Sequence, residues 1–250
     1  MMRVISSVLS LIVMLACAHA RGGESIVYDV DGVQYEGYFQ ASDAGRALVL
    51  VVHDWDGLTE YEQKRAAMLA ELGYDVFAVD LFGAGVRPTE TADKRRLIGA
   101  LYQDRATMRR LLRAGLEQAR IATGAQKPVV AAGYCFGGSA VLELARSGES
   151  LKGFASFHGG LALPEGQDYS LTQGKVLVYH GSADQAVSMQ EFASLAVDLE
   201  AAGVDHEMTT YSGAPHAFSV LGGRRYHEEA DRQSWAAFVA QLETLTLSPK

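Results

Sequence analysis

The chain has 250 residues, of which 48% are hydrophobic and 21% are charged, with 5 prolines and 26 glycines. This composition is ordinary for a globular protein and excludes disordered, collagen-like and coiled-coil chains. The formal net charge of −8 argues against binding nucleic acid or an anionic membrane through bulk charge, and 2 cysteines are too few for a disulfide framework or a structural zinc site.

The first twenty residues have the organisation of a secretory signal peptide. One basic residue precedes an apolar run over residues 8–17, and Ala18-His19-Ala20 matches the A-x-A pattern at which such peptides are cleaved. The run is too short to span a bilayer comfortably, so we expect no stable membrane anchor. We therefore predict an exported protein, periplasmic or secreted, whose residues 21–250 form a single domain. Lipidation of Cys17 is the alternative interpretation of this segment.

An antiparallel hairpin is predicted next. Residues 26–30 and 33–39 are rich in strand-forming side chains and flank Asp31-Gly32. This dipeptide accommodates the positive φ angles of a two-residue turn. We expect these two strands to open the fold.

Short apolar runs then alternate with helical patterns. Runs without polar alternation indicate strands covered on both faces, as in a parallel sheet. We expect strands at 47–52, 76–79, 128–132, 153–157, 176–179 and 207–211. We expect helices at 61–72, 94–121 with a break near 102–103, 138–145, 189–202 and 227–245. The alternation predicts an α/β fold with a doubly wound, mainly parallel sheet.

One of these runs leads into a candidate nucleophile. In an open α/β sheet, ligands bind beyond the carboxyl ends of the strands, so the residues directly after each run are the candidates. The run at 128–132 is followed by Gly133-Tyr134-Cys135-Phe136-Gly137, a G-x-C-x-G elbow with Cys where Ser is more usual. The backbone N–H of Phe136, the residue after the nucleophile, is then a predicted oxyanion donor. A structural cysteine in a glycine-rich turn is the alternative.

Two further candidates follow later strands. Asp184 comes just after the run at 176–179, and His216 follows the last predicted strand. Nucleophile, acid, histidine is the chain order of the α/β-hydrolase triad. Taken singly, a loop Asp often caps a turn and a loop His is often solvated, but the three positions together predict nucleophilic catalysis.

Other chemistries find no support in the sequence. Gly83-Ala84-Gly85 is followed by Pro88 where a dinucleotide fingerprint needs its third glycine. The histidines show no H-x-x-x-H spacing, so a metal site is unsupported. We expect neither a cofactor nor a metal, and the sequence makes no prediction of oligomeric state.

Five motifs lie in order along the chain. They are Val52-His53-Asp54-Trp55-Asp56-Gly57-Leu58, Asp80-Leu81-Phe82-Gly83, Gly133-Tyr134-Cys135-Phe136-Gly137-Gly138, His180-Gly181-Ser182-Ala183-Asp184 and Pro215-His216-Ala217-Phe218. Together they resemble the dienelactone hydrolase family of α/β-hydrolases, over a span from about residue 26 to residue 245.

The resemblance implies a Cys-His-Asp triad. Cys135 would be the nucleophile, His216 the base and then the acid, and Asp184 the residue that orients the imidazole. It also implies that Asp54 hydrogen-bonds the resting thiol and that the backbone N–H of Trp55 supplies a second oxyanion donor.

The implied reaction is hydrolysis of a small-molecule carboxylic ester or lactone, with the substrate left open. Dienelactone hydrolases carry two arginines for the substrate carboxylate, where this chain has Ala84 and Val220, and Arg87 is the nearest spare cation. The side chains expected to line the pocket are Phe82, Tyr134, His158 and Phe218. The alternatives are a thioesterase, a broad carboxylesterase or a non-catalytic binding protein on the same fold.

Overall fold

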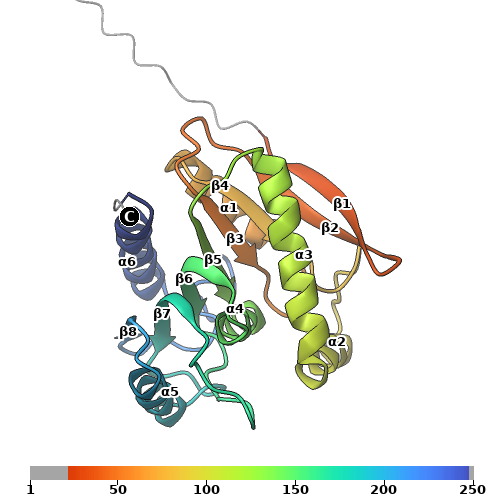
Figure 1. The fold of residues 1–250 in the computed structure, drawn as a ribbon. Coiled ribbons are helices and arrows are strands. Elements are labelled where there is room, and N and C mark those ends of the chain that lie inside the picture. Colours follow the sequence, from red (N-terminus) through yellow and green to blue (C-terminus); the bar gives the residue numbers. More distant parts are fainter. Residues whose placement is uncertain (1–21, 248–250) are drawn as a thin grey trace, which may run out of the picture.

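A computed structural model describes residues 22–247, and the predicted signal peptide with Cys17 lies outside them. The strands are β1 (Glu24–Val30), β2 (Val33–Gln40), β3 (Leu48–Val52), β4 (Asp75–Val79), β5 (Val129–Tyr134), β6 (Ser150–Phe157), β7 (Gln173–Gly181) and β8 (His206–Tyr211). They form an eight-stranded sheet in the order β1-β2-β4-β3-β5-β6-β7-β8 (Figure 1).

The sheet joins the predicted hairpin to a parallel array. β1 and β2 pair antiparallel across a turn in which Asp31 has a φ of 56°. β2 pairs antiparallel with β4, and from β4 onward the strands β4-β3-β5-β6-β7-β8 are parallel to one another. Every residue of β3, β4 and β5 is buried, as expected for strands covered on both faces. The predicted α/β fold with a mainly parallel sheet is confirmed.

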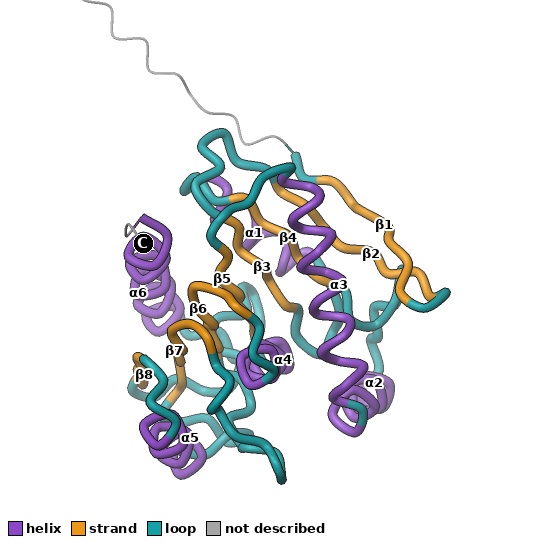
Figure 2. The backbone as a smooth tube through the Cα atoms, viewed as in Figure 1, coloured by secondary structure: helices purple, strands orange, loops and turns teal. Residues whose placement is uncertain are grey.

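Helices cover both faces of the sheet (Figure 2). They are α1 (Glu60–Glu71), α2 (Thr91–Gln103), α3 (Arg105–Thr123), α4 (Phe136–Arg146), α5 (Met189–Ala201) and α6 (Glu228–Leu247). Leu69 of α1 and Phe238 of α6 belong to one core cluster, and Leu112 of α3 and Val141 of α4 belong to another. Because adjacent residues of a strand point to opposite faces, Leu50 joins the second cluster and Val51 the first.

The break predicted near residues 102–103 lies at Asp104. This residue ends α2 and is the N-cap of α3, where its carboxylate accepts a hydrogen bond from the backbone N–H of Thr107 at 2.9 Å. A short polar side chain that satisfies a free N–H favours a helix start over helix continuation. The sequence therefore folds as two helices at this point.

Strand register brings the candidate functional residues to one edge. Val52 pairs with Gly133, Tyr134 pairs with Phe157, and Phe157 pairs with Tyr179, so these strands end side by side. The segments that follow them therefore leave the sheet at the same edge, where ligands bind in open α/β folds.

Candidate active site

Cys135 occupies a strained turn between β5 and α4. Its φ is 52°, a conformation that residues with a side chain seldom adopt. The two flanking glycines are required by close backbone approach, since a Cβ on Gly133 would lie 2.1 Å from the carbonyl oxygen of Gly137, and one on Gly137 would lie 2.2 Å from that of Val52. The predicted elbow is thus present, with Cys135 raised at the N-terminus of α4.

His216 lies between the cysteine and the aspartate. Its Nε2 is 3.1 Å from Cys135 Sγ, and its Nδ1 is 2.8 Å from Asp184 Oδ2. The other carboxylate oxygen, Oδ1, accepts the backbone N–H groups of Ala186 at 2.8 Å and Val187 at 2.9 Å. The structure therefore brings the three predicted residues together, and the carboxylate is fixed by hydrogen bonds on both oxygens.

The electrostatics of this group favour a charged imidazole. Burial alone would lower the pKa of His216, but its hydrogen bonds with Asp184 and Cys135 raise that pKa to about 10. Burial would raise the pKa of Asp184, but the hydrogen bonds from His216 and Val187 outweigh it and bring the pKa below its usual value. A proton on His216 is thus stabilised between an anionic carboxylate and the sulfur.

Asp54 is placed differently from the expectation. Its Oδ1 accepts the backbone N–H of Asp56 at 2.7 Å, and within residues 22–247 no hydrogen bond joins it to Cys135. The thiol instead contacts His216. The predicted thiol contact is absent from this arrangement, in which the short side chain of Asp54 turns back onto its own loop.

A second buried carboxylate, Glu62, lies beneath this loop and was not predicted. Its Oε2 accepts the Thr59 backbone N–H at 2.8 Å and the Thr59 hydroxyl at 2.9 Å, and its Oε1 is 3.4 Å from the Asp54 backbone N–H. Burial, and then the charge of Asp54, raise the pKa of Glu62 to about 8. The pattern Thr59-x-x-Glu62 is a capping box, a signal by which the sequence could have located it.

Three of the four residues expected in the substrate pocket are core residues. Tyr134, His158 and Phe218 are at most 1% exposed, whereas Phe82 is partly exposed and lies edge-on to the ring of His53. Tyr134 stacks on Phe157 on the face that α1 and α6 cover. These three side chains therefore pack in the core and do not line an open pocket as predicted.

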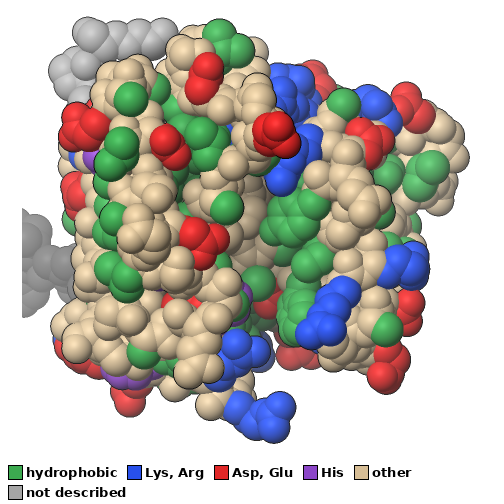
Figure 3. Space-filling view, turned by 90° about the horizontal axis from the view of Figure 1, so that it is seen from below, with side chains coloured by type: hydrophobic (Ala, Val, Ile, Leu, Met, Phe, Trp, Pro, Cys, Tyr) green, Lys and Arg blue, Asp and Glu red, His purple; other side chains and the backbone are tan. Residues whose placement is uncertain are grey.

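The face at the carboxyl ends of the strands is hollowed. Figure 3 shows a furrow there, with hydrophobic side chains along it and histidine and acidic side chains at its floor. Lys94 lies on this side of the molecule, paired with Asp56 and with its Nζ 5.3 Å from the centroid of the Trp55 ring. Arg87 is 3.9 Å from Glu36 and also donates to the Val86 carbonyl at 2.9 Å.

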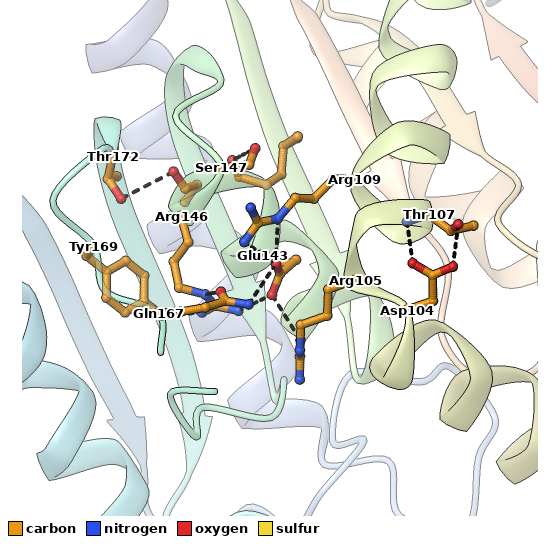
Figure 4. Close-up of polar contacts among 12 residues, drawn as sticks. Asp104, Arg105, Thr107, Arg109, Glu143, Arg146, Ser147, Gln167, Tyr169 and Thr172 are labelled. Carbon is orange, nitrogen blue, oxygen red and sulfur yellow. Dashed lines mark hydrogen bonds and ion pairs between the residues drawn. The ribbon is translucent and has the colours of Figure 1, made fainter. Parts of the chain in front are cut away.

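A charged cluster anchors the helix that carries Cys135. Figure 4 shows Glu143 of α4 surrounded by Arg105 and Arg109 of α3 and by Arg146 of its own helix. The nitrogen–oxygen distances are 2.9, 2.7 and 2.8 Å. Arg146 also donates to Tyr169 at 2.7 Å, in the segment between β6 and β7. Glu143 therefore ties α4 to α3 and to that segment.

Within residues 22–247, nowhere do three or more His, Cys, Asp or Glu side chains gather so as to hold a metal ion. Every helix in this range is too short or too polar to span a bilayer.

Curated relatives are similar to this chain in sequence. The chain is 25% identical to the "Putative carboxymethylenebutenolidase" of Salmonella typhimurium over 211 residues, 78% of this chain and 76% of that protein. It is 26% identical to the protein of the same name from Aquifex aeolicus over 204 residues, 78% of this chain and 87% of the relative.

Solved structures agree over nearly the whole chain. The structure titled "m3DLH" is 31% identical, with a TM-score of 0.82 over 90% of this chain and 98% of the other. The dienelactone hydrolase-like promiscuous phosphotriesterase P91, from metagenomic libraries, is 29% identical, with a TM-score of 0.84 over 91% and 99%. The model of the dienelactone hydrolase family matches residues 36–246. The chain therefore belongs to the dienelactone hydrolase family and is a carboxylic ester or lactone hydrolase.

Proposed function

We propose that the chain hydrolyses a small carboxylic ester or lactone through a thioester on Cys135, with His216 as base and then acid and Asp184 orienting the imidazole. The observation that carries this proposal is the position of His216, which contacts Cys135 Sγ through one ring nitrogen and Asp184 through the other. A nucleophile, a base and an orienting group within hydrogen-bond reach are the signature of nucleophilic catalysis.

The first half of the reaction forms the thioester. The thiol proton moves to His216 Nε2, and the sulfur attacks the carbonyl carbon, whose π electrons move to its oxygen. The raised pKa of His216 favours this transfer. When the tetrahedral oxyanion collapses, the bond to the leaving oxygen breaks and His216 returns the proton to that oxygen. In a lactone the leaving oxygen stays on the same molecule.

Two backbone N–H groups are available for the oxyanion. Phe136 is the first residue of α4, and the first N–H groups of a helix have no intrahelical acceptor and lie at the positive end of its dipole. In the part of the chain that the structure describes, the Trp55 N–H has no acceptor either. Donors aimed at the developing charge stabilise it in the transition state.

Hydrolysis of the thioester completes the cycle. His216 removes a proton from a water molecule, and the water oxygen attacks the thioester carbonyl carbon. The carbon–sulfur bond then breaks, the acid leaves, and the sulfur regains its proton from His216. Neither oxidant nor metal is needed for these atoms and electrons to balance.

A panel of short-chain p-nitrophenyl esters and lactones tests the proposal. For both Cys135→Ala and Cys135→Ser we expect kcat/KM to fall by about 10⁴-fold or more, as for removal of other triad nucleophiles. Circular dichroism and thermal melting check that the variants fold. Undiminished turnover by the folded Cys135→Ala variant would exclude Cys135 as the nucleophile.

The same panel separates the alternatives. Acyl thioesters added to it distinguish a thioesterase from an esterase by the ratio of kcat/KM values. A binding protein would turn over none of these substrates, and its Cys135 would react with iodoacetamide no faster than a free thiol. Phosphotriesters are a second candidate class, supported by the likeness to a promiscuous phosphotriesterase. Attack of the same sulfur on phosphorus would make paraoxon a substrate or an inactivator.

We also propose that the protein is exported and begins at Arg21 when mature. The A-x-A pattern at residues 18–20 supports cleavage there. Intact mass of the protein recovered from outside the cytoplasm is the test. A lipid-bearing N-terminus at Cys17, or an uncleaved chain, would contradict it.

A further inference from the structure

Backbone strain is concentrated around the candidate active site. Within residues 22–247, four residues other than glycine have a positive φ: Asp31 at 56°, Cys135 at 52°, His158 at 39° and Ala217 at 62°. Asp31 serves the tight hairpin turn. The other three are the nucleophile, the residue directly after β6 and the residue after His216. Such conformations cost about 1–3 kcal/mol each and persist where the surroundings hold them in place.

The imidazole of His158 joins two of these strained segments. It is completely buried, and its Nδ1 accepts the backbone N–H of Cys135 at 3.2 Å. That N–H is shared with the carbonyl oxygen of Phe157 at 3.0 Å. On the other side of the ring, Nε2 is 2.8 Å from the hydroxyl of Ser219, three residues after His216. One ring therefore links the nucleophile elbow to the loop that carries the base.

The hydrogen bonds settle where the proton of this ring lies. Because Cys135 N–H donates to Nδ1, the proton of the neutral ring is on Nε2 and is donated to Ser219. Ser219 in turn lies 2.8 Å from the hydroxyl of Tyr61. Burial, and then the charge of His216, lower the pKa of His158 well below its usual value. His158 therefore stays neutral while His216, with its ring centroid 5.5 Å away, changes charge.

The segment from His216 to Ser219, here called the histidine loop, has a second anchor that does not depend on His158. Arg65 of α1 is completely buried, donates to the backbone carbonyl of Ser219 at 2.7 Å and pairs with Asp231 of α6. Its guanidinium also lies 5.1 Å from the centroid of the Trp235 ring. Removing the Ser219 hydroxyl therefore leaves this backbone anchor in place.

We propose that His158 is a positioning residue that sets the approach of the Cys135 sulfur to His216, by holding the elbow and the histidine loop at a fixed separation. It does not act as an acid or base in the reaction, because Cys135 N–H and Ser219 occupy both of its ring nitrogens. The role rests on the proposed Cys135 mechanism. Without the bridge, the strained elbow relaxes and the 3.1 Å contact between Sγ and His216 Nε2 is lost.

Two substitutions test the two ends of the bridge. In His158→Asn, the side-chain oxygen replaces Nδ1 and the residue tolerates a positive φ, but it does not reach Ser219. Ser219→Ala removes the other partner. We expect kcat to fall by about 100-fold in His158→Asn and about 10-fold in Ser219→Ala, with KM little changed, since misplacing a catalytic group by about 1 Å costs this much.

The rate of iodoacetamide alkylation as a function of pH gives a readout that a purely structural role would not move. The wild-type protein should show rapid alkylation at neutral pH, from the sulfur paired with His216. In both variants the midpoint of this profile should move to higher pH. His206→Asn is the control, because it removes an imidazole of β8 whose Nδ1 lies 2.8 Å from the Val204 carbonyl oxygen and whose Nε2 faces Glu200, away from Cys135 and Ser219. It should change stability without moving the profile.

The double variant decides whether the two residues act as one unit. If the bridge exists, His158→Asn with Ser219→Ala should be no slower than His158→Asn alone. Additive effects, or wild-type kcat and alkylation profiles in the folded single variants, would overturn the proposal. If His158→Asn does not fold, Ser219→Ala decides by the same two readouts. Turnover that survives Cys135→Ala would instead overturn the proposed function, so the two failures are distinguishable.

Discussion

Glu143 and Glu62 are both completely buried, yet their surroundings are opposite. Glu143 meets three guanidinium groups, whose hydrogen bonds and charge outweigh the effect of burial and bring its pKa below the usual value. Glu62 meets a backbone N–H, a hydroxyl and the nearby charge of Asp54, and its pKa rises to about 8. Burial raises the pKa of both carboxylates, and only the partners of Glu143 outweigh it.

The two carboxylates also serve different parts of the molecule. Glu143 joins α4 to α3 and to the segment after β6, so it supports the frame that holds Cys135. Glu62 closes the loop that carries Asp54 and Trp55, at the edge of the sheet where ligands bind in open α/β folds. The frame is held by strong charge pairs, whereas the loop is held by a carboxyl group whose charge depends on pH near neutrality.

Removing the charge of Glu143 should give the larger loss of stability. Glu143→Gln leaves the buried guanidinium of Arg146 without its anion, and we expect a loss of about 3 kcal/mol in the free energy of unfolding at pH 7. Urea unfolding measures it. Glu149→Gln is the control, since its partner Arg113 is half exposed, and it should cost less than about 1 kcal/mol. Equal losses in the two variants would show that the buried Glu143 cluster stabilises the protein no more than a partly exposed ion pair does.

Much of the fold and the central site residues could be predicted from the sequence. Apolar runs without alternation located the buried strands. The glycines around Cys135 were visible in the sequence because no other residue fits where an added Cβ would lie 2.1–2.2 Å from a neighbouring backbone oxygen. Asp184 and His216 were found because parallel strands end at one edge, so chain order translates into proximity.

What could not be predicted depends on contacts between distant residues. Ser219 and Arg65 belong to no recognisable sequence motif and lie 154 positions apart in the chain. Only the packing of the fold brings them together. His158 was expected in the substrate pocket because it directly follows a strand. Position after a strand does not determine the direction in which the side chain points. The direction of the Asp54 carboxylate is similarly set by the loop, which offers it the N–H of Asp56.

Glu62→Gln should change the pH dependence of stability and so test the other half of the comparison. A pKa raised in the folded state means that the stabilising contribution is complete below the unfolded value of about 4.5 and is lost as pH rises through about 8. Glutamine does not titrate, so we expect the variant to gain about 2 kcal/mol relative to wild type between pH 6 and pH 8.

Urea unfolding across this pH range measures the gain, and Glu143→Gln serves as its control. The lowered pKa of Glu143 places its titration on the acid side, where stability is lost as pH falls, so its difference from wild type should stay constant between pH 6 and pH 8. Parallel pH profiles for Glu62→Gln and wild type would show that Glu62 is ionised throughout, like Glu143.

Lys94→Gln should have the smallest effect on stability. It tests whether the loop that carries Asp54 depends on a cation, as Glu143 depends on its arginines. Lys94 pairs with Asp56, and its charge lowers the pKa of Asp54, which burial otherwise raises. Removing the charge should raise the Asp54 pKa further by a fraction of a unit and cost less than about 1 kcal/mol of stability.

Carbon-13 NMR titration of labelled aspartate carboxyl groups follows this shift directly. Lys64→Gln is the matched control, because Lys64 is exposed and pairs with Glu60 at 3.5 Å. If only Lys94→Gln moves the Asp54 titration, the charge of Lys94 influences the charge of Asp54 in the loop that also carries Trp55. If neither variant moves it, Lys94 does not contribute to the Asp54 pKa, and Asp54, unlike the arginine-bound Glu143, is set by burial and by its other neighbours, of which Asp56 is the first.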